Sequence, residues 1–174
     1  IAARRALRQE IADGLCNLLH WAQTGVETTM YQSNDQRAAD IEAGAGRSAA
    51  ELRDDASASA GRWLQAANEV HSARLSTPVT RTPGSPPFPA SDVGRLRRTE
   101  LEVHHADLLI GYTAHDWPAD FTQRLLERRA DELDAKGIAM TWLLTDRDET
   151  VTVGTGGPEL TAASADLAWW LIGR

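Results

Sequence analysis

Apolar residues recur at intervals of three and four positions through most of residues 1–134, which is the spacing of helices that bury one face. The first such stretch covers residues 2–24 and ends at Gly25. Its apolar stripe consists of Leu7, Ile11, Leu15, Leu18 and Leu19. A stripe of this width needs helical neighbours, so the pattern predicts a bundle.

Further helices are predicted from residues that can cap a helix or end one. Ser33 begins a short helix through Ile41, which Gly44 and Gly46 stop. Ser48 begins a long one that reaches about Ser72. Its inward positions are Leu52, Ala56, Trp63, Ala66, Ala67 and Val70. After a proline-rich loop over residues 76–89, Ser91 and Asp92 begin a helix that ends near Gly111 and Tyr112, and residues 116–118 begin another.

The period changes after Gly137, where residues 138–144 and 150–153 favour two strands joined by a turn at residues 146–148. Residues 156–158 break the pattern, and residues 162–171 return to helix. The sequence therefore predicts a mainly α protein with two parts. Residues 1–134 form a helical bundle of roughly four main helices, and residues 135–174 form a small α+β domain.

Composition narrows the class of protein. The chain has 174 residues, of which 42% are hydrophobic, enough for a core. Its net charge of -7 argues against nucleic acid and anionic membranes as partners and favours a small-molecule substrate. A single cysteine, together with the lack of a signal segment or a long apolar run, leads us to expect a cytoplasmic location. Because the chain begins at Ile1 rather than at methionine, we also expect a preceding segment.

The strongest candidate chemistry lies on the helix after Ser91. Glu100 and His104 are one helical turn apart, so both side chains can reach one object beside the helix. Leu101, Leu108 and Tyr112 form an apolar arc on the same side, which places the pair at the edge of a core. A carboxylate and an imidazole are suitable ligands for a divalent metal such as zinc. A hydrogen-bonded interior pair remains the alternative.

Other residues are weaker candidates. His105 lies about 100° around the helix from His104, so we expect it to pack rather than bind the same ion. We expect ordinary structural roles for His20, His71 and His115 and a small buried side chain for Cys16. Arg37 and Arg174 could each clamp a carboxylate, with surface solvation as the alternative.

Several segments in order along the chain resemble the mycothiol-dependent maleylpyruvate isomerase family. The most specific are RTELEVHHADLLIGY at residues 98–112 and DWPADF at residues 116–121. Residues 17–25, 30–33 and 37–47 are similar to the family's second helix and the turn after it. LAWWLIGR at residues 167–174 is similar to a helix of its C-terminal domain.

The resemblance implies a DinB-like four-helix bundle that binds a divalent metal, usually zinc, followed by a sterol-carrier-like α+β domain. It implies that Glu100 and His104 are metal ligands and that Arg174 and Arg37 hold the carboxylates of the substrate. Members of the family use mycothiol to isomerise the cis double bond of maleylpyruvate. The metal would lower the pKa of the thiol, whose addition to the conjugated bond allows rotation.

The sequence departs from the family at the third metal ligand, a histidine that would fall at about Ala6. Either a stretch is missing from this region of the sequence, which we favour because the rest of the pattern is kept, or the ligand has been lost. The leading hypothesis is a metal- and mycothiol-dependent isomerase, or a related mycothiol-using transferase. The alternative is a noncatalytic DinB-like protein that binds a metal, a thiol or a small acid.

Overall fold

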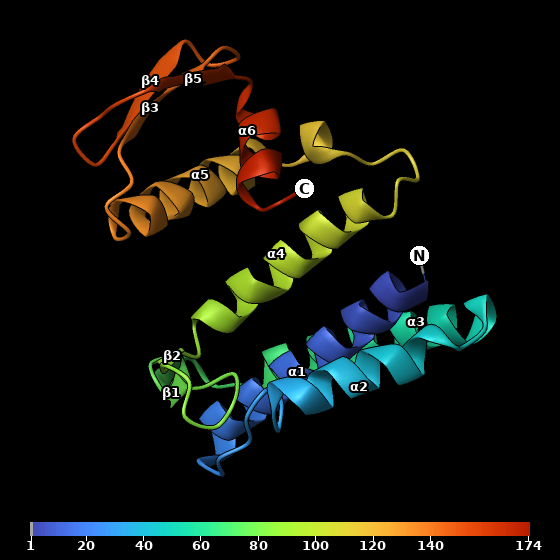
Figure 1. The fold of residues 1–174 in the computed structure, drawn as a ribbon. Helices are drawn as coiled ribbons and strands as arrows, with labels where there is room; N and C mark the ends of the chain where they lie inside the picture. Colours follow the sequence, from blue (N-terminus) through green and yellow to red (C-terminus); the bar gives the residue numbers. More distant parts are fainter. Residues whose placement is uncertain (1) are drawn as a thin grey trace. The chain divides into compact units, whose positions relative to one another are not determined.

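The computed structural model describes the backbone of residues 2–174 and the side chains from Ile11 onward, and the chain divides into two compact units, Ile1–Leu108 and Leu109–Arg174. The helices and strands of the N-terminal unit are α1 (Ala2–Thr24), α2 (Asn34–Ala45), α3 (Ala49–Glu69), β1 (Pro78–Val79), β2 (Phe88–Pro89) and α4 (Asp92–Asp107) (Figure 1). Those of the C-terminal unit are α5 (Ala119–Asp134), β3 (Met140–Leu144), β4 (Glu149–Val153), β5 (Glu159–Ala162) and α6 (Ser164–Leu171). Short 3-10 turns lie at Ser72–Arg74 and Ala114–Asp116.

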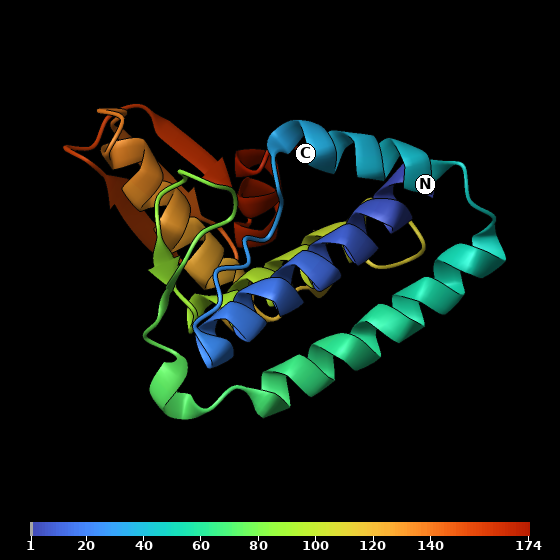
Figure 2. The ribbon, with the colours of Figure 1, turned by 90° about the horizontal axis from the view of Figure 1, so that it is seen from below.

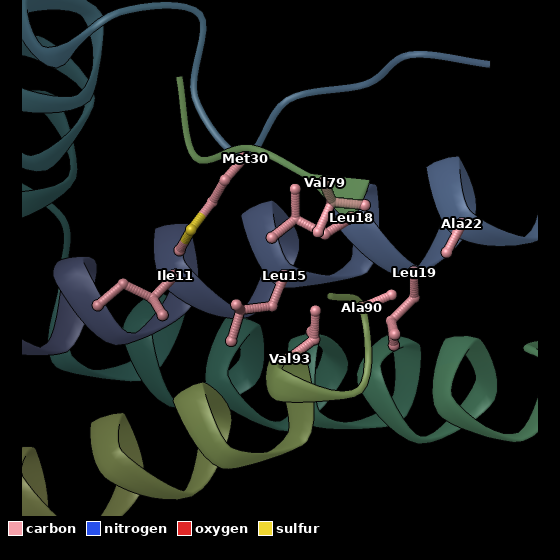
Figure 3. Close-up of a cluster of buried hydrophobic side chains, with 9 residues drawn as sticks. All are labelled: Ile11, Leu15, Leu18, Leu19, Ala22, Met30, Val79, Ala90 and Val93. Carbon is pink, nitrogen blue, oxygen red and sulfur yellow. The ribbon is translucent and has the colours of Figure 1, made fainter. Parts of the chain in front are cut away.

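The N-terminal unit is built around α1, which contacts α2, α3 and α4 along its length (Figure 2). The apolar stripe of α1 supplies most of the core, as the sequence predicted. Figure 3 shows these side chains meeting residues from the loop after α1, from β1 and from the start of α4. The cluster consists of Ile11, Leu15, Leu18, Leu19, Ala22, Met30, Val79, Ala90 and Val93. Within the described residues, the predicted bundle is thus formed by α1 to α4.

The predicted caps of α2 and α3 are confirmed. The hydroxyl of Ser33 accepts a hydrogen bond from the backbone N–H of Gln36 at 3.0 Å. Ser48 and Glu51 form a reciprocal capping box at the start of α3. The predicted Ser91 cap is wrong, because this residue has helical backbone angles and its side chain makes no capping hydrogen bond.

Some predicted boundaries and faces are also wrong. α2 continues beyond Ile41 to Ala45, and α3 ends at Glu69 rather than at Ser72. Only a narrow stripe of α3 is covered by α1, so Ala56 and Ala67 are exposed.

α4 ends at Asp107 and not at Tyr112. The reason is local, because Leu109 and Gly111 have left-handed φ angles of 55° and 94° that a helix cannot accommodate.

The proline-rich segment predicted as a loop contains a short antiparallel pair, in which Val79 lies opposite Phe88. Val79 is fully buried in the core, which anchors the hairpin to α1. Beyond it, the backbone N–H of Tyr31 donates a hydrogen bond to the carbonyl of Arg81 at 2.8 Å. The loop is therefore held against the segment that leads into α2.

The C-terminal unit has a three-stranded sheet in the order β4-β3-β5. The predicted hairpin is β3 with β4, paired antiparallel. The sequence analysis missed β5, which pairs parallel with β3 and places Leu160 beside the fully buried Trp142. Residues 159–161 were given no element and Ala162 was assigned to the last helix, because a parallel pairing joins strands that are not adjacent in the sequence and leaves no local signal.

α5 belongs to this second unit, where it packs against α6 and β4. Trp117, just before α5, makes an edge-to-face contact with Phe121 at 5.3 Å between ring centroids and also contacts Trp169 of α6. The contacts thus divide the chain after Leu108. The domain boundary after residue 134 remains a prediction.

None of the helices in the described part of the chain is long and apolar enough to cross a membrane.

Candidate functional site

The candidate site lies on the last two turns of α4 and consists of Glu100, His104 and Asp107. The carboxylate of Glu100 is 2.9 Å from Nε2 of His104, and the carboxylate of Asp107 is 2.9 Å from Nδ1 of the same ring. The spacing of four and three residues puts all three side chains on one face of the helix. Both ring nitrogens of His104 are therefore held by carboxylates.

The three side chains become more buried along α4 from Glu100 to Asp107. The side chains of Glu100, His104 and Asp107 are 21%, 9% and 2% exposed. Burial alone lowers the pKa of His104, but the hydrogen bonds and negative charge of Glu100 and Asp107 outweigh it and raise the pKa above its usual value. Each carboxylate accepts a hydrogen bond from one ring nitrogen, so a metal at Nε2 would take the place of the proton shared with Glu100, while Asp107 would keep the proton on Nδ1.

The donor set fits a metal in part. An imidazole nitrogen and a carboxylate oxygen are usual zinc ligands, and their separation of 2.9 Å is that of a hydrogen-bonded pair in this structure. Among the residues whose side chains are described, no group of three histidine, cysteine, aspartate or glutamate residues could hold an ion. The predicted third-ligand position, Ala6, lies outside the described side chains.

The predicted apolar arc beside the pair is only partly present. Leu108 is buried, but Leu101 is 38% exposed and Tyr112 lies beyond the end of α4. His104 is itself buried, as are its neighbours Val103 and Ala106 on α4.

The two predicted arginines lie in different units. Arg37 is on α2, and its guanidinium carbon is 5.4 Å from the centroid of the Tyr31 ring, a cation–π distance. Arg174 is exposed in the C-terminal unit, after α6, and its backbone N–H donates to the carbonyl of Trp169 at 3.3 Å.

The remaining histidines occupy separate places. His105 is half-buried on α4, and His20 is exposed at the end of α1. His71 accepts a hydrogen bond from the backbone N–H of Ala73 and caps a 3-10 turn. His115 lies 2.9 Å from Asp166 on the surface of the C-terminal unit. These placements agree with ordinary structural roles.

Cys16 lies on α1 and is only half-buried, whereas the sequence predicted a buried side chain. Burial and the nearby Asp13 raise the pKa of its thiol. The thiol therefore stays protonated at neutral pH, which makes it a poor nucleophile.

The sequence analysis did not identify Asp107, Tyr31 or Arg81. The spacing of three residues between His104 and Asp107 was a usable signal for the first. Tyr31 and Arg81 are fifty positions apart in the sequence and are brought together only by the loop after β1.

Comparison with known proteins adds to this geometry. The family described as "Mycothiol maleylpyruvate isomerase N-terminal domain" matches residues 9–109. The chain belongs to this family.

Solved structures agree with the assignment to the mycothiol maleylpyruvate isomerase family. The crystal structure of the mycothiol-dependent maleylpyruvate isomerase is similar with a TM-score of 0.90 and 26% identity, over 99% of this chain and 73% of that one. A histidine-to-alanine mutant of the enzyme matches over the same shares at 26% identity with a TM-score of 0.89. No curated protein sequence matches the chain. The predicted mainly α fold with a small strand-containing region is thus confirmed, and the relatives support an enzyme that depends on mycothiol.

Proposed function

We propose that this chain is a metal- and mycothiol-dependent cis–trans isomerase of an unsaturated dicarboxylate of the maleylpyruvate type. The observation that carries the proposal is the Glu100–His104 pair, backed by the buried Asp107, in a chain of the mycothiol maleylpyruvate isomerase family. A pair that only stabilised the helix would not need a third, almost fully buried carboxylate on the far nitrogen of the ring.

Each residue then has a defined task. Glu100 and His104 would hold the metal through a carboxylate oxygen and Nε2, and Asp107 would keep the proton on Nδ1. A bound divalent metal and mycothiol together would supply a thiolate able to add to a conjugated double bond and permit rotation about it. Arg37 and Arg174 bind the carboxylates of the substrate, where positive charge also stabilises negative charge that develops on the adjacent carbonyl oxygen.

The decisive experiment measures zinc content and mycothiol-dependent isomerisation of maleylpyruvate in the full-length protein. Glu100→Ala and His104→Ala are each expected to lower bound zinc about tenfold or more and to abolish turnover, because each removes a ligand. His105→Ala is the matched control, since it removes a neighbouring imidazole from a different face of α4. It should keep both the metal and the activity.

Other outcomes would change the proposal. Zinc content that is unaffected in Glu100→Ala and His104→Ala would remove the metal site. Bound metal without any mycothiol-dependent turnover would favour the noncatalytic binding protein. Consumption of mycothiol with another electrophile, and no isomerisation, would assign a transferase.

A further inference from the structure

A pocket of about 360 Å³ in the N-terminal unit is lined by one predicted site residue, Arg37, and by five residues to which no role has been assigned. Three segments form it: the loop before α2, the first turn of α2, and the loop between β1 and β2. Its lining consists of Tyr31, Asn34, Arg37, Arg81, Thr82 and Ser85. Every one of these side chains is polar or carries a polar group, which is unusual for a pocket that only reflects imperfect packing.

The pocket concentrates positive charge. Arg37 and Arg81 line it together, and in the described part of the chain neither forms an ion pair. Other arginines of the same unit do form ion pairs: Arg62 is 2.8 Å from Asp13, and Arg95 is 2.9 Å from Asp92. In a chain with a net charge of -7, two such arginines in one concave site indicate an external anion.

Tyr31 gives the pocket a hydrogen-bond donor as well as an aromatic wall. Its hydroxyl oxygen is buried, and no acceptor of good geometry for its O–H lies within the described residues, although the Arg37 guanidinium is near enough to act as a donor to it. Burial raises the pKa of Tyr31 despite the opposing effect of Arg37 and Arg81, so the hydroxyl keeps its proton at neutral pH. A buried O–H without a partner is costly, and a bound acceptor would satisfy it.

The same tyrosine lies within electrostatic range of the candidate metal site. The positive charges of Arg37 and Arg81 lower the pKa of the Tyr31 hydroxyl, whereas the negative charge of Glu100 raises it.

The pocket is also held in shape by the backbone. The Tyr31 N–H donates to the Arg81 carbonyl at 2.8 Å, which fixes the aromatic wall to the arginine-bearing loop. In that loop the Thr82 N–H donates to the hydroxyl of Ser85 at 3.2 Å, and the Ser85 N–H donates to the Thr82 carbonyl at 3.1 Å. An arrangement of this kind needs little reorganisation on binding.

We infer that Arg37, Arg81 and the Tyr31 hydroxyl form a carboxylate-binding subsite that holds the acidic end of the substrate. Arg81 was not predicted as a site residue. With Arg37 it gives the subsite two guanidinium groups that can bind one carboxylate. The inference rests on the proposed function for the identity of the ligand as a carboxylate. It predicts that Arg81 affects binding of the substrate and leaves metal binding unchanged.

Titration calorimetry with succinate, a dicarboxylate that does not react with thiols, tests the subsite directly in the full-length protein. Arg81→Ala and Arg37→Ala should each weaken succinate binding about tenfold, while Arg81→Lys should weaken it less because a point charge remains. Tyr31→Phe should weaken it by a smaller factor. Dimethyl succinate, which carries no charge, should not bind.

Arg53→Ala is the matched control, because Arg53 is an exposed arginine of the same unit on α3, outside the pocket. It should bind succinate like the unmodified protein. Zinc content should be equal in Arg53→Ala and Arg81→Ala, and in the isomerase assay Arg81→Ala should raise KM for maleylpyruvate about tenfold.

Failure of this inference is distinct from failure of the proposed function. Undiminished succinate binding by Arg81→Ala, tighter binding of inorganic phosphate than of succinate, or no succinate binding at all would overturn the subsite. Loss of succinate binding in Arg81→Ala from a protein that shows no isomerase activity would keep the subsite and reject the isomerase.

Discussion

At the scale of single residues, the function of His104 depends on which of its nitrogens is protonated. A metal needs Nε2 without its proton, and that condition is met when the proton resides on Nδ1. Asp107 accepts the hydrogen bond from Nδ1 at 2.9 Å and is almost completely buried, so water cannot easily take its place. The orientation of the ligand is thus set by a residue that need not touch the metal.

We predict that Asp107→Ala lowers zinc affinity about 10- to 100-fold, because the ring loses the partner that fixes its orientation. Competition with a chromophoric chelator at neutral pH measures the change. Asp107→Asn keeps a hydrogen-bond acceptor without the charge and should give a smaller loss.

Because Asp107 is buried, a thermal melt must accompany each of these two measurements. Zinc affinity equal to that of the unmodified protein in a folded Asp107→Ala variant would show that Asp107 has no positioning role.

At the scale of elements, the short helix α6 depends on a contact from outside itself. The residue at its N-cap, Ala163, has no side chain that can cap the helix. Instead the carboxylate of Asp146, in the turn after β3, accepts hydrogen bonds from both the backbone N–H and the hydroxyl of Ser164, each at 2.8 Å. A carboxylate at this end of a helix also interacts favourably with the helix dipole.

We predict that Asp146→Ala destabilises the C-terminal unit by about 1 kcal/mol, a modest value because the carboxylate is exposed to solvent. Urea unfolding followed by tryptophan fluorescence measures it, since Trp117, Trp142 and Trp169 lie in this unit. Glu149→Ala, which removes an exposed carboxylate from β4, should have a smaller effect.

The same contact predicts a direction for the pH dependence. Burial is the largest single effect and opposes ionisation of Asp146, but the two hydrogen bonds from Ser164, with smaller favourable effects, together outweigh it and lower the pKa below its ordinary value of 3.8. The stabilisation is therefore complete above pH 3.8 and is lost as the pH falls through the lower value of the folded state. Asp146→Ala should lack this acid-dependent part, and an identical acid dependence in both proteins would contradict the assignment.

At the scale of the whole molecule, the contacts divide the chain after α4, whereas the sequence predicts a domain boundary after residue 134. The connecting residues Leu109 and Ile110 are 81% and 65% exposed, while the buried Phe121, Leu125 and Leu126 of α5 face its own unit. Ile138, beside the boundary expected from the sequence, is 41% exposed.

Limited proteolysis distinguishes these two positions. Thermolysin cleaves before large apolar residues, and we predict that its first cuts fall at Leu109 or Ile110, since these are the more exposed sites. Mass spectrometry of the fragments identifies the cut. First cleavage at Ile138 would instead favour a division after residue 134.

The sequence by itself determined the features that depend on short-range geometry. The period of the apolar residues located the helices and the β3–β4 hairpin, and the one-turn spacing of Glu100 and His104 brought two donors together on α4. Motif order along the chain was also enough to identify the family. These features follow from residues at most a few positions apart, where the backbone geometry of a helix or strand is known in advance.

Only the tertiary structure decided the features that join distant parts of the chain. The parallel pairing of β5 with β3, the placement of α5 in the C-terminal unit and the meeting of Tyr31 with Arg81 each depend on how the loops run. Loop paths are set by packing and by backbone hydrogen bonds over long sequence separations, which leave no period in the sequence. For the same reason, the burial of Asp107 could not be predicted from the sequence and is known only from the folded structure.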